Sequence, residues 1–176
     1  MRVVSGKYRG KKLKEFNLDT TRPTLDRVKE SIFNLIQFDI FNSVVLDLFS
    51  GTGAFGVEAI SRGAKKVYFI DSNSQAIKII NENLKGIEGD YVVKQTDALL
   101  FLNGNEKFDI VLLDPPYKTD LGVRAIDALI NGNKLNDGGI IIFETSADLN
   151  FSFNYPNFSI TEKKYGTVKV FKFIKE

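Results

Sequence analysis

The stretch VVLDLFSGTGAFG, residues 44–56, predicts a strand, a tight glycine turn and the start of a helix. Its first five residues are mostly apolar, as in a buried strand, and a helix is expected over residues 53–62. Gly51, Gly53 and Gly56 fit the spacing G-x-G-x-x-G, in which glycines permit a tight turn and let a ligand approach the backbone closely. A purely structural turn is the alternative interpretation.

Beyond this stretch, strands and helices alternate along the chain. Strands are predicted over residues 44–48, 66–70, 91–95, 108–113 and 139–143, and helices over 53–62, 74–85 and 121–130, with a short helix capped by Asp97 that runs through Leu102. This alternation implies a parallel sheet with right-handed crossovers. Two further β-rich runs, 158–165 and 167–174, should pair as an antiparallel hairpin because no helix separates them. We therefore predict an α/β protein with a mostly parallel seven-stranded sheet and an antiparallel C-terminal hairpin.

The composition excludes several kinds of functional site. The chain of 176 residues has no cysteine and no histidine, so disulfides, thiol nucleophiles, thiolate metal sites and histidine bases are ruled out. It has no apolar run of about 18 residues, which a membrane-spanning helix would need. The first residues also lack the apolar core of a signal peptide. We expect a cytoplasmic protein whose chemistry involves neither a metal nor a membrane.

Positive charge is concentrated at the N-terminus. The first 14 residues contain six basic side chains and no acidic one, namely Arg2, Lys7, Arg9, Lys11, Lys12 and Lys14. A small β-hairpin is predicted here from residues 2–6 and 11–13, followed by a helix that Thr24 caps and that runs through Ile36. A basic segment on a nearly neutral chain suggests a polyanionic partner. A solvated charged hairpin is the alternative.

Acidic residues lie on the first predicted strand and at the ends of the next two, and they suggest a nucleoside ligand. Asp71 lies 20 residues after Gly51, where a carboxylate can accept hydrogen bonds from both ribose hydroxyls. Asp97 could accept one from an adenine amino group, or could simply cap a helix. Asp47 is expected to point toward the glycine turn, where it would oppose a dinucleotide pyrophosphate and favour the ammonium and sulfonium of S-adenosylmethionine. A loop-capping role is the alternative for Asp47.

The tetrapeptide Asp114-Pro115-Pro116-Tyr117 follows the predicted strand 108–113 and indicates amino-group chemistry. An exocyclic amine on a nucleobase is a poor nucleophile because its lone pair is delocalised into the ring. The Asp114 carboxylate and the Pro115 carbonyl could accept its two hydrogens and free that lone pair, while the prolines restrict the backbone. Tyr117 could stack on the base. Catalysis would then rest on orientation and electrostatics, and the base would have to leave its stack. A rigid turn is the alternative.

These residues together resemble the S-adenosylmethionine-dependent methyltransferases of Rossmann-like fold, in which an [Asp/Asn]-Pro-Pro-aromatic motif marks amino methylation. More narrowly, the chain is similar to the RsmD family. Four blocks carry that similarity in order, namely RVVSGKYRGKKL (2–13), TRPTLDRVKESIFN (21–34), LDLFSGTGAFGVEA (46–59) and DPPY (114–117). The similarity spans nearly the whole chain.

The resemblance implies a 16S ribosomal RNA guanine-N2 methyltransferase that uses S-adenosylmethionine as methyl donor and acts on the 16S RNA or the small ribosomal subunit. It implies a single domain over 1–176, with a basic N-terminal extension over 1–38 and a catalytic core over 39–176. The guanine would be held by residues 114–117, and RNA by the basic hairpin. The donor-binding residues would be Asp47, Ser50, Gly51, Thr52, Gly53, Asp71 and Asp97, with the segment from Arg22 to Thr24 over the cleft.

Four other functions fit part of the pattern. An adenine-N6 methyltransferase uses the same chemistry on DNA or RNA but normally needs a separate target-recognition region. A protein glutamine methyltransferase more often has Asn where this chain has Asp114. An NAD-dependent oxidoreductase is disfavoured by Asp47 and by the Asp-Pro-Pro-Tyr set, and a non-catalytic RNA-binding module would leave that set without a role. The sequence does not indicate the oligomeric state, for which a monomer is the default expectation.

Overall fold

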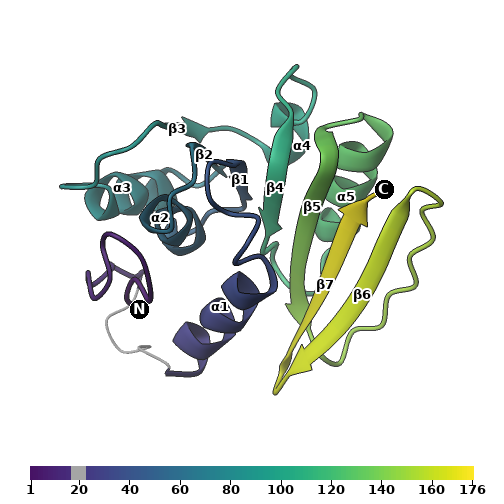
Figure 1. Cartoon of the computed structure of the whole chain (residues 1–176), viewed down its shortest axis with the longest axis horizontal. Helices are drawn as coiled ribbons and strands as arrows, with labels where there is room; N and C mark the ends of the chain where they lie inside the picture. Colours follow the sequence, from purple (N-terminus) through teal and green to yellow (C-terminus); the bar gives the residue numbers. More distant parts are fainter. Residues whose placement is uncertain (17–22) are drawn as a thin grey trace.

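The computed structural model describes residues 1–16 and 23–176, and in this part of the chain seven strands form one sheet with helices on both faces (Figure 1). The helices are α1 (Pro23–Leu35), α2 (Ala54–Ser61), α3 (Ser74–Asn83), α4 (Ala98–Phe101) and α5 (Leu121–Asn131). The strands are β1 (Val44–Leu48), β2 (Lys66–Asp71), β3 (Tyr91–Gln95), β4 (Phe108–Leu113), β5 (Leu135–Ser146), β6 (Phe158–Tyr165) and β7 (Val168–Lys175). The predicted α/β class is confirmed.

The order of the strands reverses direction at the centre of the sheet. The order is β3-β2-β1-β4-β5-β7-β6, with β1 to β5 parallel and with β7 antiparallel to both β5 and β6. The chain moves outward from β1 to β3 and then returns to β4 beside β1. The connections after β1 and β4 therefore diverge, which opens a crevice at the carboxyl ends of these strands. The antiparallel C-terminal hairpin is as predicted.

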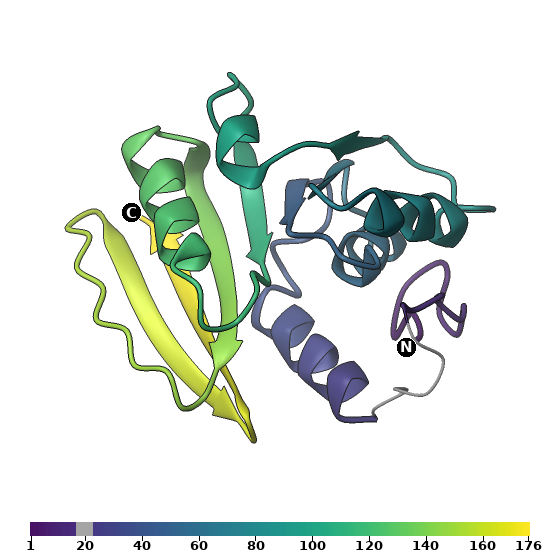
Figure 2. The same ribbon diagram turned by 180° about the vertical axis from the view of Figure 1, so that it is seen from behind.

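Two hydrophobic clusters, one on each face, bury the sheet. Successive strand residues alternate between them, so that Val45 packs with α1, α2 and α3, whereas Leu46 and Leu48 pack with α4 and α5. The view from behind shows α5 covering its side of the sheet (Figure 2). Burial on both faces explains why the parallel strands are nearly continuous apolar runs in the sequence.

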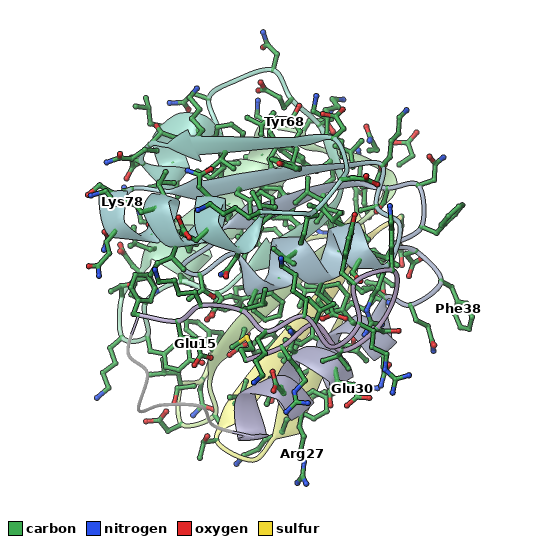
Figure 3. All side chains as sticks on the ribbon, turned by 90° about the vertical axis from the view of Figure 1, so that its left-hand side faces the viewer. Glu15, Arg27, Glu30, Phe38, Tyr68 and Lys78 are labelled. Atoms are coloured by element: carbon green, nitrogen blue, oxygen red, sulfur yellow. The ribbon has the colours of Figure 1, made fainter. Side chains whose placement is uncertain are left out.

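The N-terminal segment lies beside α1 and α2 (Figure 3), and a buried carboxylate binds its backbone. Glu58 of α2 is 0% exposed and accepts hydrogen bonds from the backbone N–H groups of Val4 and Ser5, at 2.8 and 3.0 Å. The same carboxylate pairs with Lys29 at 3.2 Å and with Arg62 at 2.8 Å. A buried charge needs such partners, so the segment completes the coordination of Glu58.

Gly6 brings this segment into direct contact with α2. It has a φ of +85°, and a Cβ at this position would lie 1.8 Å from the carbonyl oxygen of Ser61. The neighbouring Lys7 N–H donates to that carbonyl at 2.8 Å. Only glycine therefore fits at residue 6.

Some predicted bounds were wrong. The small N-terminal β-hairpin is confirmed but short: Arg2 and Lys12 form an antiparallel bridge, and the N–H groups of Val3 and Leu13 donate to the carbonyls of Lys11 and Met1 at 2.9 and 3.0 Å. Helix α1 begins at Pro23, so Thr24 lies in the first turn and is not the cap; proline is favoured at the first helical position because its missing N–H would be unpaired there anyway. Strand β5 is longer than predicted, since it pairs along most of β7.

Exposed aromatic residues follow α1 in the connection to β1. Phe38 is 91% exposed and projects into solvent (Figure 3), and Phe41 is also exposed. In the residues the structure describes, no helix has both the length and the apolar character required to cross a bilayer.

Candidate active site

A cavity of about 600 Å³ lies at the carboxyl ends of β1, β2 and β4. Its wall combines the glycine turn, the ends of three strands and the Asp-Pro-Pro-Tyr tetrapeptide. The polar side chains that line it include Asp71, Asp97, Asp114, Tyr117 and Glu144. A smaller neighbouring cavity of about 260 Å³ shares Phe49, Gly51, Asp114 and Glu144 with it.

The glycine turn has the backbone conformation that its sequence predicts. Gly51 and Gly53 have φ angles of 54° and 76°, and Gly53 is the residue from which α2 starts. A Cβ on Gly56 would lie 2.2 Å from the ring of Phe69, so this glycine allows α2 to pack tightly on β2. Phe49 has a φ of 65°, a left-handed conformation that is rare for an aromatic residue. The turn thus exposes its backbone to the cavity.

Asp71 is fixed in place by two backbone donors. Its Oδ2 accepts from the Gly51 N–H at 2.9 Å, and its Oδ1 accepts from the Asn73 N–H at 2.8 Å. An ionised carboxylate has about four lone-pair positions, so both oxygens retain capacity for ligand hydroxyls. Asp71 lines the cavity as the sequence predicted.

Asp47 does not line either cavity described above, contrary to the expectation that it points toward the ligand. It is 2% exposed, and its Oδ2 accepts from the Gly56 N–H at 2.9 Å. On β1 it shares the face of Val45, which is turned toward α2. Burial raises the pKa of Asp47 to about 8. The hydrogen bond from the Gly56 N–H stabilises the ionised form and lowers the pKa, but by less than burial raises it. The Asp47 carboxyl group thus binds a backbone N–H in the first turn of α2, and a contribution to donor binding stays a prediction.

Asp97 has both of the roles considered for it. Its Oδ1 accepts from the Leu100 N–H at 2.9 Å and caps α4. The side chain is also exposed and lines the cavity. The helix cap therefore fixes the carboxylate without removing it from the cavity wall.

Asp114 presents its carboxyl group to both cavities at the end of β4. In residues 1–16 and 23–176 no hydrogen bond to this carboxyl group is formed. Asp114 is exposed to the cavities, and desolvation by the protein atoms around its carboxyl group, together with the neighbouring Glu144 and Asp47, raises its pKa above its usual range. Pro115 and Pro116 follow it along the wall of the larger cavity.

Tyr117 combines an accessible ring with an anchored hydroxyl group. The side chain is 43% exposed, and its hydroxyl donates to Oε1 of Glu144 at 2.9 Å. Burial and the neighbouring carboxyl groups of Glu144 and Asp114 raise the pKa of Tyr117, so the hydroxyl remains a donor at neutral pH. The anchored hydroxyl fixes the orientation of the ring.

Glu144 is a site residue that the sequence interpretation missed. It is 6% exposed at the end of β5, and the pairing of Leu113 with Phe143 brings it beside Asp114. The signal was present, since an acid directly follows the apolar run 140–143 just as Asp114 follows the apolar run of β4. Burial raises the pKa of Glu144, whereas the hydrogen bond from Tyr117 lowers it.

The remaining predicted donor-binding residues divide into three groups. Ser50 and Thr52 line the smaller cavity, and the Ser50 hydroxyl donates to the Asp47 carbonyl at 2.6 Å. Gly53 shapes the turn and lines neither cavity described above. Arg22 lies outside the described residues, as does the side chain of Thr24.

Of the predicted RNA-binding residues, Arg2, Lys7, Arg9, Lys12 and Lys14 are exposed. Lys7 pairs with Glu88 at 2.7 Å, and this hydrogen bond raises the lysine pKa. Lys11 is half-buried and donates to the carbonyl of Lys85 at 2.6 Å. Lys11 therefore attaches the segment to the turn that follows α3, so its ammonium group is less available to a partner than those of the exposed lysines.

A family model described as "Conserved hypothetical protein 95" matches residues 1–174. The chain is 38% identical over 154 residues to Ribosomal RNA small subunit methyltransferase D of Haemophilus influenzae, covering 84% of this chain and 80% of that protein. It is 36% identical to Putative rRNA methyltransferase YlbH of Bacillus subtilis, with 97% and 96% covered. The solved structure of the putative methyltransferase yhhF from Escherichia coli superposes with a TM-score of 0.89, at 29% identity, covering 100% of this chain and 98% of that one. The chain therefore belongs to the RsmD family of methyltransferases.

Proposed function

We propose that this protein transfers a methyl group from S-adenosylmethionine to the exocyclic N2 amine of a guanine in 16S ribosomal RNA of the small subunit. The relatives named as small-subunit ribosomal RNA methyltransferases support the RNA substrate. The observation that carries the chemistry is one continuous cavity lined by Asp71 and Asp97 as well as by residues 114–117. Groups suited to a nucleoside donor and groups suited to a base amine thus share one space.

The residues around the cavity fit the methyl donor. Asp71 and Asp97 offer carboxylate acceptors for ribose hydroxyls and an adenine amino group. The carboxyl groups of Asp114 and Glu144 have raised pKa values, and a cationic ligand in the same space would lower these values and favour the ionised forms. When bound, the donor supplies an activated methyl group on a positively charged sulfur. No metal is required for this chemistry, since the protein contributes orientation and electrostatics.

Asp114 and Pro115 orient the acceptor amine. The Asp114 carboxylate and the Pro115 carbonyl accept the two N2 hydrogens, which directs the nitrogen lone pair away from the ring. The carboxylate is then placed to take the proton that the amine loses on methylation. The Tyr117 ring, oriented through Glu144, provides the stacking surface for the base.

The test is methylation of 16S RNA, and of small subunits, from cells that lack this protein. The expected product is N2-methylguanine in the RNA, identified by mass spectrometry of its nucleosides. N6-methyladenine instead would favour the adenine-N6 alternative. Preferential binding of NAD over S-adenosylmethionine in calorimetry would favour an oxidoreductase.

Asp114→Ala should abolish turnover and leave donor binding nearly intact, because this carboxylate acts on the amine. Asp137→Ala is the matched control, since Asp137 is an exposed aspartate at the opposite end of the sheet. A loss of donor affinity equal to the loss of rate would contradict the assigned role of Asp114. Unchanged activity in cells carrying Asp114→Ala would favour a non-catalytic RNA-binding module.

The organisation and setting of the protein remain predictions. We propose a single domain over residues 1–176 that acts as a monomer in the cytoplasm. The exposed residues Arg9, Lys12 and Lys14 would contact RNA phosphates.

A further inference from the structure

Glu144 is buried at the base-binding end of the cavity with much of its hydrogen-bonding capacity unused. Its Oε1 accepts from the Tyr117 hydroxyl at 2.9 Å. Within residues 1–16 and 23–176 its Oε2 accepts no hydrogen bond. In this part of the chain no fully buried side-chain oxygen lacks a hydrogen-bond partner, so the unbonded Oε2 is open to the cavity, where a ligand can donate to it.

The position of Glu144 relative to Asp114 indicates what that ligand presents. Strands β4 and β5 are parallel neighbours, and Leu113 pairs with Phe143, so the two carboxyl groups lie side by side on one wall. Each also lines the smaller cavity. Two adjacent acceptors fit a ligand edge that carries two adjacent donors.

We propose that Glu144 accepts a hydrogen bond from N1–H of the guanine whose N2 amine is held by Asp114. This inference rests on the proposed function and specifies how the base is selected. Guanine carries the donors N1–H and N2–H next to each other on its Watson–Crick edge. Adenine carries an acceptor, N1, next to its N6 amine, so a Glu144 carboxylate would face a lone pair and disfavour it.

Tyr117 is the positioning residue for this contact. Its hydroxyl occupies Oε1 of Glu144 and leaves Oε2 for the base, while its ring remains accessible for stacking. Replacing the tyrosine by phenylalanine preserves the ring but removes the hydrogen bond that orients the carboxylate. The hydroxyl group therefore contributes to the choice of base, whereas the ring contributes to the binding of the base.

The test compares two RNA substrates in which the target position is either guanine or 2-aminopurine. Both bases have the 2-amino group, but N1 of 2-aminopurine is an acceptor. The wild-type protein should methylate guanine with a kcat/KM at least about tenfold higher, as expected for a hydrogen bond to a charged group. Glu144→Gln provides an amide N–H that can donate to an acceptor N1. This variant should therefore lose activity on guanine, and its ratio of guanine to 2-aminopurine activity should fall toward one.

The matched control is Asp97→Asn, which also replaces a carboxylate by an amide and can still cap α4. It should lower both rates alike and leave the substrate ratio at its wild-type value. Tyr117→Phe should lower the ratio in the same direction as Glu144→Gln. Thermal melting and calorimetry with S-adenosylmethionine establish that each variant is folded and binds the donor.

The outcomes separate this inference from the proposed function. If the wild-type protein forms N2-methylguanine but Glu144→Gln reduces both substrates equally, Glu144 does not read N1 and the inference is wrong. If the wild-type protein forms no N2-methylguanine on guanine-containing 16S RNA, either free or in small subunits, the proposed function itself fails. A ratio that shifts only in Glu144→Gln and Tyr117→Phe supports the contact.

Discussion

Asp47→Asn should make the ligand-free protein increasingly more stable than the wild type as the pH rises. The carboxyl group of Asp47 has a pKa of about 8 when folded, against 3.8 when exposed, because burial disfavours its charged form. The folded state therefore holds a proton that the unfolded state releases above about pH 4. Since a raised carboxyl pKa makes unfolding release a proton, stability falls with rising pH over this interval. Asparagine has no proton to release.

The size of the effect follows from one proton. Each pH unit between the two pKa values changes the free energy of unfolding by about 1.36 kcal/mol, so from pH 5 to pH 7 the variant should gain about 2.7 kcal/mol relative to the wild type. For a protein of this length this corresponds to a difference of roughly 5–10 °C in Tm. The difference should level off above pH 8, where Asp47 is ionised in both states. Asparagine can still accept the hydrogen bond from Gly56.

Urea unfolding of both proteins at pH 5, 6, 7 and 8, without ligand, measures this slope. Glu88→Gln provides a control of opposite sign, because the hydrogen bond from Lys7 lowers the Glu88 pKa. Glu88 contributes to the stability of the folded protein above the pKa that this carboxyl group has in the unfolded chain. This contribution disappears as the pH falls through the lower pKa of the folded state. A pH-independent difference between Asp47→Asn and the wild type would refute the reasoning, since Asp47 would then be ionised in the folded protein.

Two further predictions concern the N-terminal segment. Replacing Arg9, Lys12 and Lys14 by alanine should weaken RNA binding and reduce the salt slope by about 0.7–0.9 for each lost phosphate contact, measured by filter binding across a salt series. Glu58→Ala should destabilise the protein by about 3–5 kcal/mol in urea unfolding, because it leaves the Lys29 ammonium buried without its carboxylate partner.

Each of these predictions has a control within the chain. Alanine at residues 163–164, two exposed lysines of β6, removes positive charge far from the N-terminal segment and should leave the salt slope unchanged (Figure 1). An equal change of slope there would indicate a non-specific effect of net charge. For the buried ion pair, Glu82→Ala removes the exposed partner of Lys85 and should change stability by less than about 1 kcal/mol. Equal losses for Glu58 and Glu82 would contradict the role of burial.

The sheet was predictable because its signals are local. The apolar runs of β1, β4 and β5 are buried on both faces by the hydrophobic clusters, and glycine marks the turn at residues 51–56. The orientation of Asp47 was not predictable from its distance to Gly51. A one-residue step along a strand reverses the face, and only the packing of α2 determines which face meets the ligand.

Long-range contacts account for what the sequence did not reveal. The role of Glu144 depends on the pairing of β4 with β5 and on the Tyr117 hydroxyl, 27 residues earlier in the chain. The N-terminal hairpin was predicted from local β propensity, but its attachment to α2 was not. The Glu58 carboxylate accepts from Val4 and Ser5, which lie 54 and 53 residues away in the sequence.

The carboxyl groups around the cavity have a consequence for the end of the proposed reaction. A positively charged ligand would favour the ionised forms of Asp114 and Glu144, whose pKa values are raised in the ligand-free protein, and Asp71 and Asp97 line the same cavity. Methyl transfer would convert the sulfonium into a neutral thioether, so the part of the attraction that depends on the charged sulfur would be lost, whereas the ammonium group of the donor would remain. The site would thus hold the spent donor less tightly than the fresh one. Inhibitors built on the spent donor would need to restore a cation at the sulfur position.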